Sequence, residues 1–301
     1  MQLGKISETR PWHDEEGEVL DSTMPQVYEK RILRVLDHIH QNPAGDLSLD
    51  ALADVAAMSR FHWHRVFHAM TGETCAEAVR RIRLHRASLW LVQSAMPVAE
   101  VAARAGYPNV QSFTRIFREG YGLTPAAFRK KGVPSAPFKS KQHGVRIMYT
   151  VTITEGPARR LFAVPHKGAY NAIGAAFDAL GTIVAARNLW PHAQGMVAVY
   201  YDDPNSVPEA DLTSHAGLVV DAAAVLPDGL QEMRLPGGKM AVLRFKGPYS
   251  GLKAAYDYLY GVWLPGSGEE AADSPPFEDY INNPMDTAPA DLLTDICVPI
   301  K

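Results

Sequence analysis

Apolar positions recur at helical spacing from residue 26 to residue 131. In the stretch 27–41, Ile32, Val35, Leu36 and Ile39 share one face, as expected of a helix that packs on a core. The same spacing, with Ser48 and Thr124 as N-caps and Gly72 as a stop signal, predicts six further helices. They cover 47–58, 59–72, 75–94, 97–106, 110–122 and 124–131. The first half of the chain is therefore predicted to be all-helical.

Beyond residue 145 the pattern changes to short alternating stretches rich in β-branched residues, which are typical of strands. Predicted strands cover 146–157, 195–204, 216–225, 239–249 and 293–300, and predicted helices cover 171–188 and 252–264. Strands and helices separated by Pro- and Gly-rich loops favour an α+β domain.

The second half also contains an internal repeat. HKGAY at 166–170 matches FKGPY at 245–249, and AAFDAL at 175–180 matches AAYDYL at 254–259, so the two copies lie 79 residues apart. Each copy is predicted to be a strand, a glycine-containing turn and a helix. Duplication of such a unit predicts a pseudo-symmetric antiparallel sheet with a cleft between its halves, and coincidence is the alternative.

These patterns divide the chain into four segments. Residues 1–25 are acidic and lack periodicity, which predicts a mobile leader. Residues 26–131 form the helical domain, and 132–145, rich in Pro, Gly, Ser and Lys, form a linker. Residues 146–301 form the α+β domain.

Two helices of the first domain resemble each other. Segments 59–72 and 110–122 each carry an apolar stripe and an Arg-x-Phe unit, with Arg65 and Arg115 in corresponding places 50 positions apart. Each follows a short helix of small residues and a turn, so the pattern predicts two helix-turn-helix units joined by the helix 75–94. Such a helix can enter the DNA major groove when one face packs on its partner and the other presents hydrogen-bonding side chains.

Both arginines are therefore expected to point away from the hydrophobic interior. Arg65 and Arg115 could contact guanine or phosphate, and Gln111 could pair with adenine. Two units on one rigid helix would reach groove segments about 34 Å apart, so one chain could do the work of a dimer.

Composition sets broad limits on the function. The chain of 301 residues is 47% hydrophobic and 21% charged, which indicates a folded protein. We find no run of 18 apolar residues and no apolar core of a signal peptide, so a cytoplasmic protein without a membrane partner is expected. Cys75 and Cys297 stand far apart and are predicted to be buried and inert.

Charge is unevenly distributed along the chain. Residues 26–143 carry 17 basic and nine acidic side chains, a net of +8, whereas residues 144–301 carry 11 and 18, a net of −7. A basic block followed by an acidic block indicates a polyanion-binding domain joined to a domain with another role. Chance clustering is the alternative.

Residues 26–131 resemble the DNA-binding domain of the AraC/XylS family of transcription regulators. The resemblance is carried by VAEVAARAGYPNVQSFTRIFREGYGLTPAAFRK, which includes the Gly106-Tyr107 pair, Phe113, Phe117 and Thr124-Pro125. It implies a homeodomain-like tandem helix-turn-helix fold. The DNA-facing positions that it implies are Phe61, His62, His64 and Arg65 in the first unit, and Val110, Gln111, Ser112, Thr114 and Arg115 in the second.

Residues 148–301 resemble the GyrI-like small-molecule-binding domain. The resemblance is carried by the paired Lys-Gly-x-Tyr turns, by VWLPGSGEEAADSPPFEDYINNP at 262–284 and by the ending LLTDICVPI. In that family an acidic residue in an aromatic cleft meets cationic or amphipathic ligands, and here it is Glu278. The candidate ligand-binding residues are Tyr170, Tyr249, Tyr256, Trp263, Phe277, Glu278 and Tyr280.

The chemistry of such a cleft is coherent. A carboxylate among aromatic rings is poorly solvated, and a cation that arrives can pair with it and lie against the ring faces. For any single tyrosine, a half-buried core position with a wet hydroxyl is the simpler interpretation.

Other interpretations of the basic side chains also have to be weighed. His62, His64 and His68 have a spacing that resembles a zinc site, but no carboxylate or cysteine nearby completes it, so no metal and no cofactor are predicted. The arginines of the joining helix could be a solvated face or could contact phosphates. They are Arg80, Arg81, Arg83 and Arg86.

Together these features predict a transcription regulator, an activator, that binds double-stranded promoter DNA and senses a small cationic or amphipathic effector, as a multidrug sensor does. RNA polymerase is a further candidate partner, and a monomer or weak dimer is expected. One alternative is a hydrolase in which Glu278 is a general base and Tyr170 or Tyr249 a proton donor. The other is a protein-interaction module; we predict no catalytic residue and no enzyme.

Overall fold

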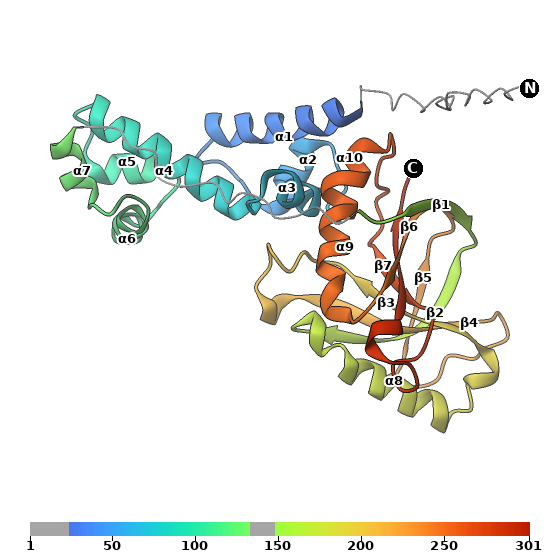
Figure 1. Cartoon of the computed structure of the whole chain (residues 1–301). Coiled ribbons are helices and arrows are strands. Elements are labelled where there is room, and N and C mark those ends of the chain that lie inside the picture. The colour runs from blue at the N-terminus through green and yellow to red at the C-terminus, as the bar shows by residue number, and fades with distance from the viewer. Residues whose placement is uncertain (1–23, 133–147) are drawn as a thin grey trace, which may run out of the picture.

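The computed structural model describes residues 24–132 and 148–301, in two parts (Figure 1). The predicted leader lies almost wholly outside the described residues, and so does the predicted linker. The first part is all-helical, as predicted. Its helices are α1 (Met24–Gln41), α2 (Leu49–Ala56), α3 (Trp63–Thr71), α4 (Cys75–Gln93), α5 (Val98–Arg104), α6 (Val110–Tyr121) and α7 (Pro125–Lys131).

Side-chain caps fix where these helices begin. Ser48 and Thr124 cap α2 and α7 as predicted, each accepting a backbone N–H from the first turn. Thr74 and Glu77 form a reciprocal capping box at the start of α4. Asn109 accepts the N–H groups of residues 111 and 112 and thereby sets the first residue of α6. The caps satisfy N–H groups that a helix cannot satisfy by itself.

Two apolar clusters show that the first part is a pair of helix-turn-helix units. One cluster joins α1, α2, α3 and the start of α4 around Trp63 and Phe67. The other joins the end of α4 to α5, α6 and α7 around Phe113, Phe117 and Phe128. Because α4 contributes to both clusters, it holds the two units together, as the sequence predicts.

The second part is one antiparallel sheet of eight strands with helices. The strands are β1 (Val151–Gly156), β2 (Arg159–Lys167), β3 (Ala193–Tyr200), β4 (Thr213–Val220), β5 (Gln231–Leu235), β6 (Gly238–Lys246), β7 (Phe277–Tyr280) and β8 (Leu293–Pro299). Their order is β1-β6-β8-β7-β3-β4-β2-β5. The helices are α8 (Gly174–Ala186), α9 (Leu252–Tyr258) and the short α10 (Leu264–Gly266), with a π-helical turn at Leu259–Trp263 between the last two.

The predicted duplication explains this strand order. The succession β2, α8, β3, β4 is repeated as β6, α9, β7, β8, and β3 pairs with β7 where the two halves meet. Gly168 and Gly247 have positive φ angles at matching turns, each before a short 3-10 helix that begins with tyrosine. Strands β5 and β7 were not predicted, because each is only five or four residues long.

Helices cover one face of the sheet. Helix α8 packs on β2 and β4 around Leu180 and Val184, and α9 packs on β6 and β8 around Ala255 and Leu259. The opposite face carries a separate apolar cluster that includes Val197, Phe277 and Cys297. The seam between β3 and β7 therefore lies between the two helices.

The two parts share an apolar core, which the prediction of a flexible linker did not anticipate. Tyr28 of α1 and Val66 of α3 belong to the same buried cluster as Tyr260 and Leu264 of the second part. Figure 1 shows α3 beside α9, whereas α6 lies at the far end of the first part. Gly261 permits this approach, since a Cβ there would lie 2.9 Å from the Cβ of Ala69 and 3.0 Å from its carbonyl oxygen.

Polar contacts surround this shared core. Arg31 pairs with Glu270 at 2.6 Å, and the hydroxyl of Ser59 donates to Asp273 at 3.0 Å. Tyr28 donates to the carbonyl oxygen of Glu269 at 3.1 Å. The basic first part thus meets the acidic second part through an ion pair as well as through apolar contact.

Two other expectations concern the cysteines and membrane-spanning helices. Cys75 and Cys297 are free and buried, as predicted, and burial raises the pKa of both thiols, which disfavours the reactive thiolate. In the part of the chain that the structure describes, none of the helices combines the length and the apolar character needed to span a bilayer.

Gly106 allows a test of the packing between the helix-turn-helix units. It has φ +80°, and a Cβ there would overlap the carbonyl oxygen of Pro43 and lie 2.8 Å from the Arg83 guanidinium carbon. Gly122 has a similar φ of +71° but open space around it. We expect Gly122→Ala to lower the free energy of unfolding by about 1 kcal/mol, the strain of a left-handed residue, and Gly106→Ala by about 3 kcal/mol because overpacking is added. Urea denaturation measures both, and equal losses would contradict the packing account.

Candidate functional site

Glu278 lies on the central strand β7, at the seam of the two repeats. Its side chain is only 4% exposed, although it carries a carboxylate. Tyr256 of α9 donates to one carboxylate oxygen at 3.2 Å, and Tyr280 donates to the other at 2.9 Å. A buried acid is thus held by hydroxyl groups and not by an ion pair.

This environment changes the acidity of Glu278. Burial raises the pKa of the carboxyl group from 4.5 to about 7, against the opposing effects of the hydrogen bonds from the tyrosines and of the nearby Arg65. The hydrogen bonds favour the ionised form but do not offset the lost hydration. Glu278 is therefore a poorly solvated acid that a positive charge would stabilise.

The two repeats place a matching tyrosine on each side of this acid. Tyr200 at the end of β3 corresponds to Tyr280 at the end of β7, 80 residues later, and their hydroxyl groups lie 3.1 Å apart. Opposite Glu278 in the paired strands stands Ala198. The acid therefore belongs to one half only, and the ring of tyrosine hydroxyls comes from both.

The helices complete the aromatic surroundings. Phe177 of α8 and Tyr249 each have their ring edge-on to Tyr280, at centroid distances of 5.4 and 5.6 Å. Tyr249 is 39% exposed and therefore lies at the outer edge of this aromatic cluster. Tyr170 lies with its ring 4.7 Å from that of Tyr200. The structure thus brings together four predicted residues, Tyr249, Tyr256, Glu278 and Tyr280, with Tyr170 one ring further away.

Two residues predicted to line this cleft lie elsewhere. Side chains of a strand alternate between its faces, so Phe277 points away from the face that carries Glu278 and packs in the cluster on the other side of the sheet. The prediction for Phe277 was wrong for this reason. Trp263 packs against the apolar core shared by α9 and the first part, and none of the ring contacts among the described residues joins it to the tyrosines around Glu278.

Sequence reasoning missed three members of the cluster. Phe177 corresponds to Tyr256 in the repeat, and Tyr200 corresponds to Tyr280, so a full alignment of the two copies would have found both. Tyr260 lies one turn after Tyr256, with the two rings nearly parallel at a centroid distance of 6.3 Å. Its role depends on the contact with α3, which the sequence does not reveal.

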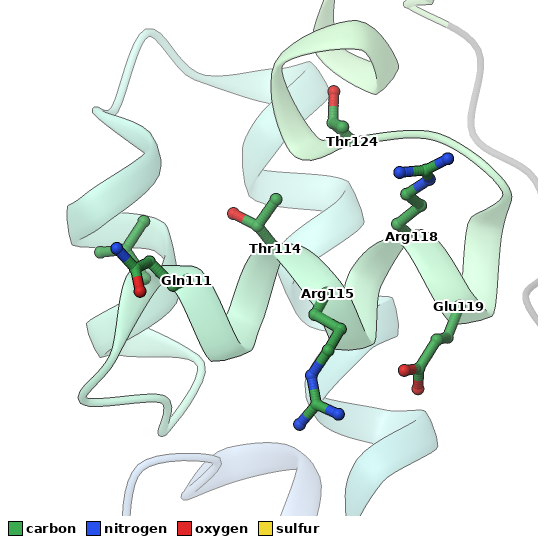
Figure 2. A pocket seen from close by; sticks show the side chains of 7 residues that line it. Gln111, Thr114, Arg115, Arg118, Glu119 and Thr124 are labelled. Carbon is green, nitrogen blue, oxygen red and sulfur yellow. The ribbon is translucent and has the colours of Figure 1, made fainter.

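Helix α6 presents its predicted positions to solvent. Val110, Gln111 and Arg115 are exposed, and Ser112 and Thr114 are partly exposed. Figure 2 shows the side chains of Gln111, Thr114, Arg115 and Arg118 around a surface hollow along α6. The apolar residues Phe113 and Phe117 face the core, as predicted.

Helix α3 differs sharply from α6. His62, His64 and Arg65 are 0%, 4% and 8% exposed, and Phe61 is partly buried with its ring 6.5 Å from that of Tyr201. The expectation that Arg65 points away from the interior is wrong in this arrangement, because the second part of the chain covers it. These four positions cannot reach DNA while α3 is docked in this way.

Arg65 lies against two aromatic residues of the second part. Its guanidinium carbon lies 5.5 Å from the ring centroid of Tyr256 and 5.7 Å from that of Tyr260. The guanidinium also donates to the carbonyl oxygen of Asp202 at 2.6 Å and to that of Tyr200 at 3.4 Å. The same Asp202 carbonyl accepts a hydrogen bond from Tyr170.

His62 is held in its neutral form by the same contact. One ring nitrogen lies 2.8 Å from the Tyr260 hydroxyl, and the other lies 2.8 Å from the carbonyl oxygen of Ser274. Burial, with Arg65 adding to it, lowers the pKa of His62 to about 3. Burial also lowers the pKa of His64, to about 4. Both rings are thus uncharged at neutral pH.

The remaining basic side chains mostly serve the fold. Arg81 pairs with Glu73, Arg80 with Glu119, and Arg83 donates to the Pro43 carbonyl oxygen. Arg86 lies over the ring of Trp90. Among the residues that the structure describes, no three His, Cys, Asp or Glu side chains are grouped as metal ligands.

Comparison with known protein families agrees with this architecture. Residues 149–301 match the family described as the GyrI-like small molecule binding domain, and residues 52–131 match a helix-turn-helix domain of the AraC type. The chain belongs to the GyrI-like family and carries an AraC-type helix-turn-helix domain.

Curated relatives of this GyrI-like protein include proteins named for roles in regulation. The probable transcription factor PqrA of Proteus vulgaris is 34% identical over 101 residues, which cover 34% of this chain and 82% of PqrA. Regulatory protein SoxS of Salmonella typhimurium is 29% identical over 106 residues, 35% of this chain and 95% of SoxS. The bifunctional transcriptional activator/DNA repair enzyme AdaA of Bacillus subtilis is 32% identical over 96 residues, 32% of this chain. The chain spans 46% of the length of AdaA.

Because its pKa is raised, the ionised form of Glu278 is expected to destabilise the folded GyrI-like domain. A carboxyl group whose folded pKa exceeds its unfolded value costs stability above pH 4.5, and the cost grows until the pH passes 7. We expect Glu278→Gln to raise the free energy of unfolding of this domain by about 3 kcal/mol at pH 8 and by about 1 kcal/mol at pH 5. Calorimetric melts at the two pH values measure the difference.

Glu232→Gln is the matched control for this change. The hydrogen bond from Arg160 lowers the pKa of Glu232, so the same substitution removes a favourable interaction and should not stabilise the domain at any pH. If the two substitutions changed the free energy of unfolding equally at both pH values, the account of Glu278 as a desolvated acid would be contradicted.

Proposed function

We propose that this protein is a DNA-binding transcription regulator, an activator, whose GyrI-like domain binds a small cationic or amphipathic effector. The DNA-binding part of this proposal rests on the polar, solvent-exposed face of α6 within an AraC-type helix-turn-helix domain. Its relatives PqrA, named a probable transcription factor, and SoxS, named a regulatory protein, support the same role. RNA polymerase is the partner that activation would require.

The exposed face of α6 has the chemistry needed for the major groove. Arg115 and Arg118 are cations that can contact guanine edges or phosphates, and Gln111 can pair with adenine. The side chain of Asn109 accepts the backbone N–H of Gln111, so the backbone from which the Gln111 side chain projects is held in place. The buried Phe113 and Phe117 hold the opposite face of the helix on the core. A rigid helix with polar side chains on its free side can distinguish bases at little entropic cost.

The Glu278 cluster supports the effector half of the proposal. A buried carboxyl group with a pKa near 7 gains most from a ligand that brings a positive charge. Tyrosine and phenylalanine rings from both repeats offer faces for a cation and area for an apolar body. A ligand with both features, such as an aromatic quaternary ammonium ion, fits this combination.

DNA recognition by α6 is tested by replacing Arg115. Selection from a random duplex library with the full-length chain supplies a binding site. We expect Arg115→Ala to weaken binding to that site by about 10- to 100-fold, the worth of one base contact, and to relax selectivity at one base pair. Fluorescence anisotropy over a range of salt concentrations measures both effects.

Arg234→Ala is the control for the charge that is lost. Arg234 is an exposed arginine of the GyrI-like domain, on β5, so its removal changes net charge equally without altering α6. Unchanged binding by Arg115→Ala, or equal weakening by both variants, would overturn the role of α6.

Effector binding is tested with benzyltrimethylammonium, whose charge does not depend on pH. Because the ionised form of Glu278 is the one that attracts a cation, and it predominates above pH 7, affinity should be about tenfold higher at pH 8 than at pH 6. Glu278→Gln should bind weakly and without this pH dependence. Isothermal titration calorimetry measures the affinities, with benzyl alcohol as an uncharged comparison.

Three results would count against a cation site at Glu278. They are equal affinity for the charged and uncharged compounds, an affinity in Glu278→Gln that still rises with pH, and no binding by either protein. Hydrolysis of a reactive ester that disappears in Glu278→Gln would favour the catalytic alternative.

A further inference from the structure

The two helix-turn-helix units are in different states within one chain. Helix α6 is open to solvent along its polar face, whereas the corresponding positions of α3 are buried by the GyrI-like domain. Arg115 and Arg65 stand at matching places, yet Arg115 is exposed and Arg65 is 8% exposed. In this arrangement only one unit can enter a major groove.

Arg65, one of the side chains through which α3 docks, is a cation that lies against aromatic rings. Arg65 lies within cation–π distance of Tyr256 and Tyr260. The hydroxyl of Tyr256 donates to Glu278, so one tyrosine contacts both the guanidinium group and the buried acid. Arg65 thus gives the aromatic cluster part of what a cationic ligand would give it.

The docked contact leaves three buried nitrogen atoms without a hydrogen-bond partner in the part of the chain that the structure describes. The Nε atom of Arg65 and both ring nitrogens of His64 are buried and have no hydrogen-bond partner of normal geometry among the described residues. Each such group loses its hydration without full compensation when α3 docks. On DNA, or in water, the same groups would be satisfied.

We propose that Arg65 is an internal ligand of the aromatic cluster around Glu278, and that a cationic effector and Arg65 occupy this cluster in a mutually exclusive way. Effector binding then frees α3, and the protein gains its second DNA contact. This inference rests on the proposed function, because it needs both an effector and a DNA site.

Thermodynamic linkage gives the inference measurable consequences. If the effector binds only when Arg65 has left, its apparent affinity is reduced by the fraction of molecules that are undocked. Any change that weakens docking must therefore tighten effector binding. The same change must lengthen the DNA segment that one chain protects, from one groove segment to two.

Gly261 offers a way to weaken docking without touching Arg65 or Glu278. A side chain there meets the backbone of Ala69 in α3, so Gly261→Leu should force the two domains apart. Gly266→Leu is the matched control, because a Cβ at this nearby glycine has no atom within 4 Å. Neither glycine has a positive φ, so no left-handed strain is introduced.

The experiment uses full-length wild type and both variants, with benzyltrimethylammonium as the probe. We expect Gly261→Leu to bind the probe roughly tenfold more tightly than wild type, within the usual range of allosteric coupling, and Gly266→Leu to match wild type. Hydrogen–deuterium exchange of the segment 59–72 should speed up in wild type when the probe is added. Exchange in 110–121 should not change.

DNA footprinting completes the test. Wild type without the probe should protect one groove segment, whereas wild type with the probe and Gly261→Leu without it should protect two, about one helical turn apart. Probe binding that leaves exchange in 59–72 unchanged or slower, or that is equally tight in all three proteins, would overturn the inference while leaving effector binding intact. Weaker probe binding by Gly261→Leu than by wild type would also overturn the inference, and absence of probe binding by all three proteins would instead overturn the effector site itself.

Discussion

The burial of one carboxyl group at the seam of two repeats is the constraint on which the rest of the structure depends. Glu278 has lost its hydration and keeps only hydrogen bonds from tyrosines, so its pKa is raised to about 7. Both of those tyrosines belong to the second repeat, as the acid does, whereas the first repeat contributes Tyr200, whose hydroxyl lies 3.1 Å from that of Tyr280, and Ala198 opposite Glu278. A buried, poorly solvated acid of this kind costs stability, as strained functional sites commonly do.

Much of this architecture could be predicted from the sequence, because local chemistry determines it. Capping residues such as Ser48 and Thr124, the stop at Gly72 and the 79-residue repeat indicated where helices begin and how the second domain is built. Glu278 was identified as a member of the aromatic cluster through the family resemblance. Its low solvation follows from the rings around it, as the sequence suggested.

What the sequence could not reveal depends on contacts between distant segments. Arg65 and Arg115 have the same local pattern, and only the docking of α3 on α9 and the π-helical turn makes one buried and the other exposed. Phe277 was misplaced because β7 is a four-residue strand, too short for its alternation to be visible in the sequence. The position of Tyr260 depends on the π-helical turn that follows α9, and a helical pattern in the sequence does not indicate such a turn.

The shared helix α4 has a consequence for the DNA itself. Its residues enter the apolar cores of both helix-turn-helix units, so α3 and α6 keep a fixed separation and a fixed mutual rotation. Inserting a single base pair between the two contacted segments turns one of them by roughly 35° about the duplex axis, given about 10.5 base pairs per turn. A stiff protein has no way to follow that rotation, and the duplex would have to untwist. In the proposed state with α3 released, spacer length would therefore be read together with base sequence.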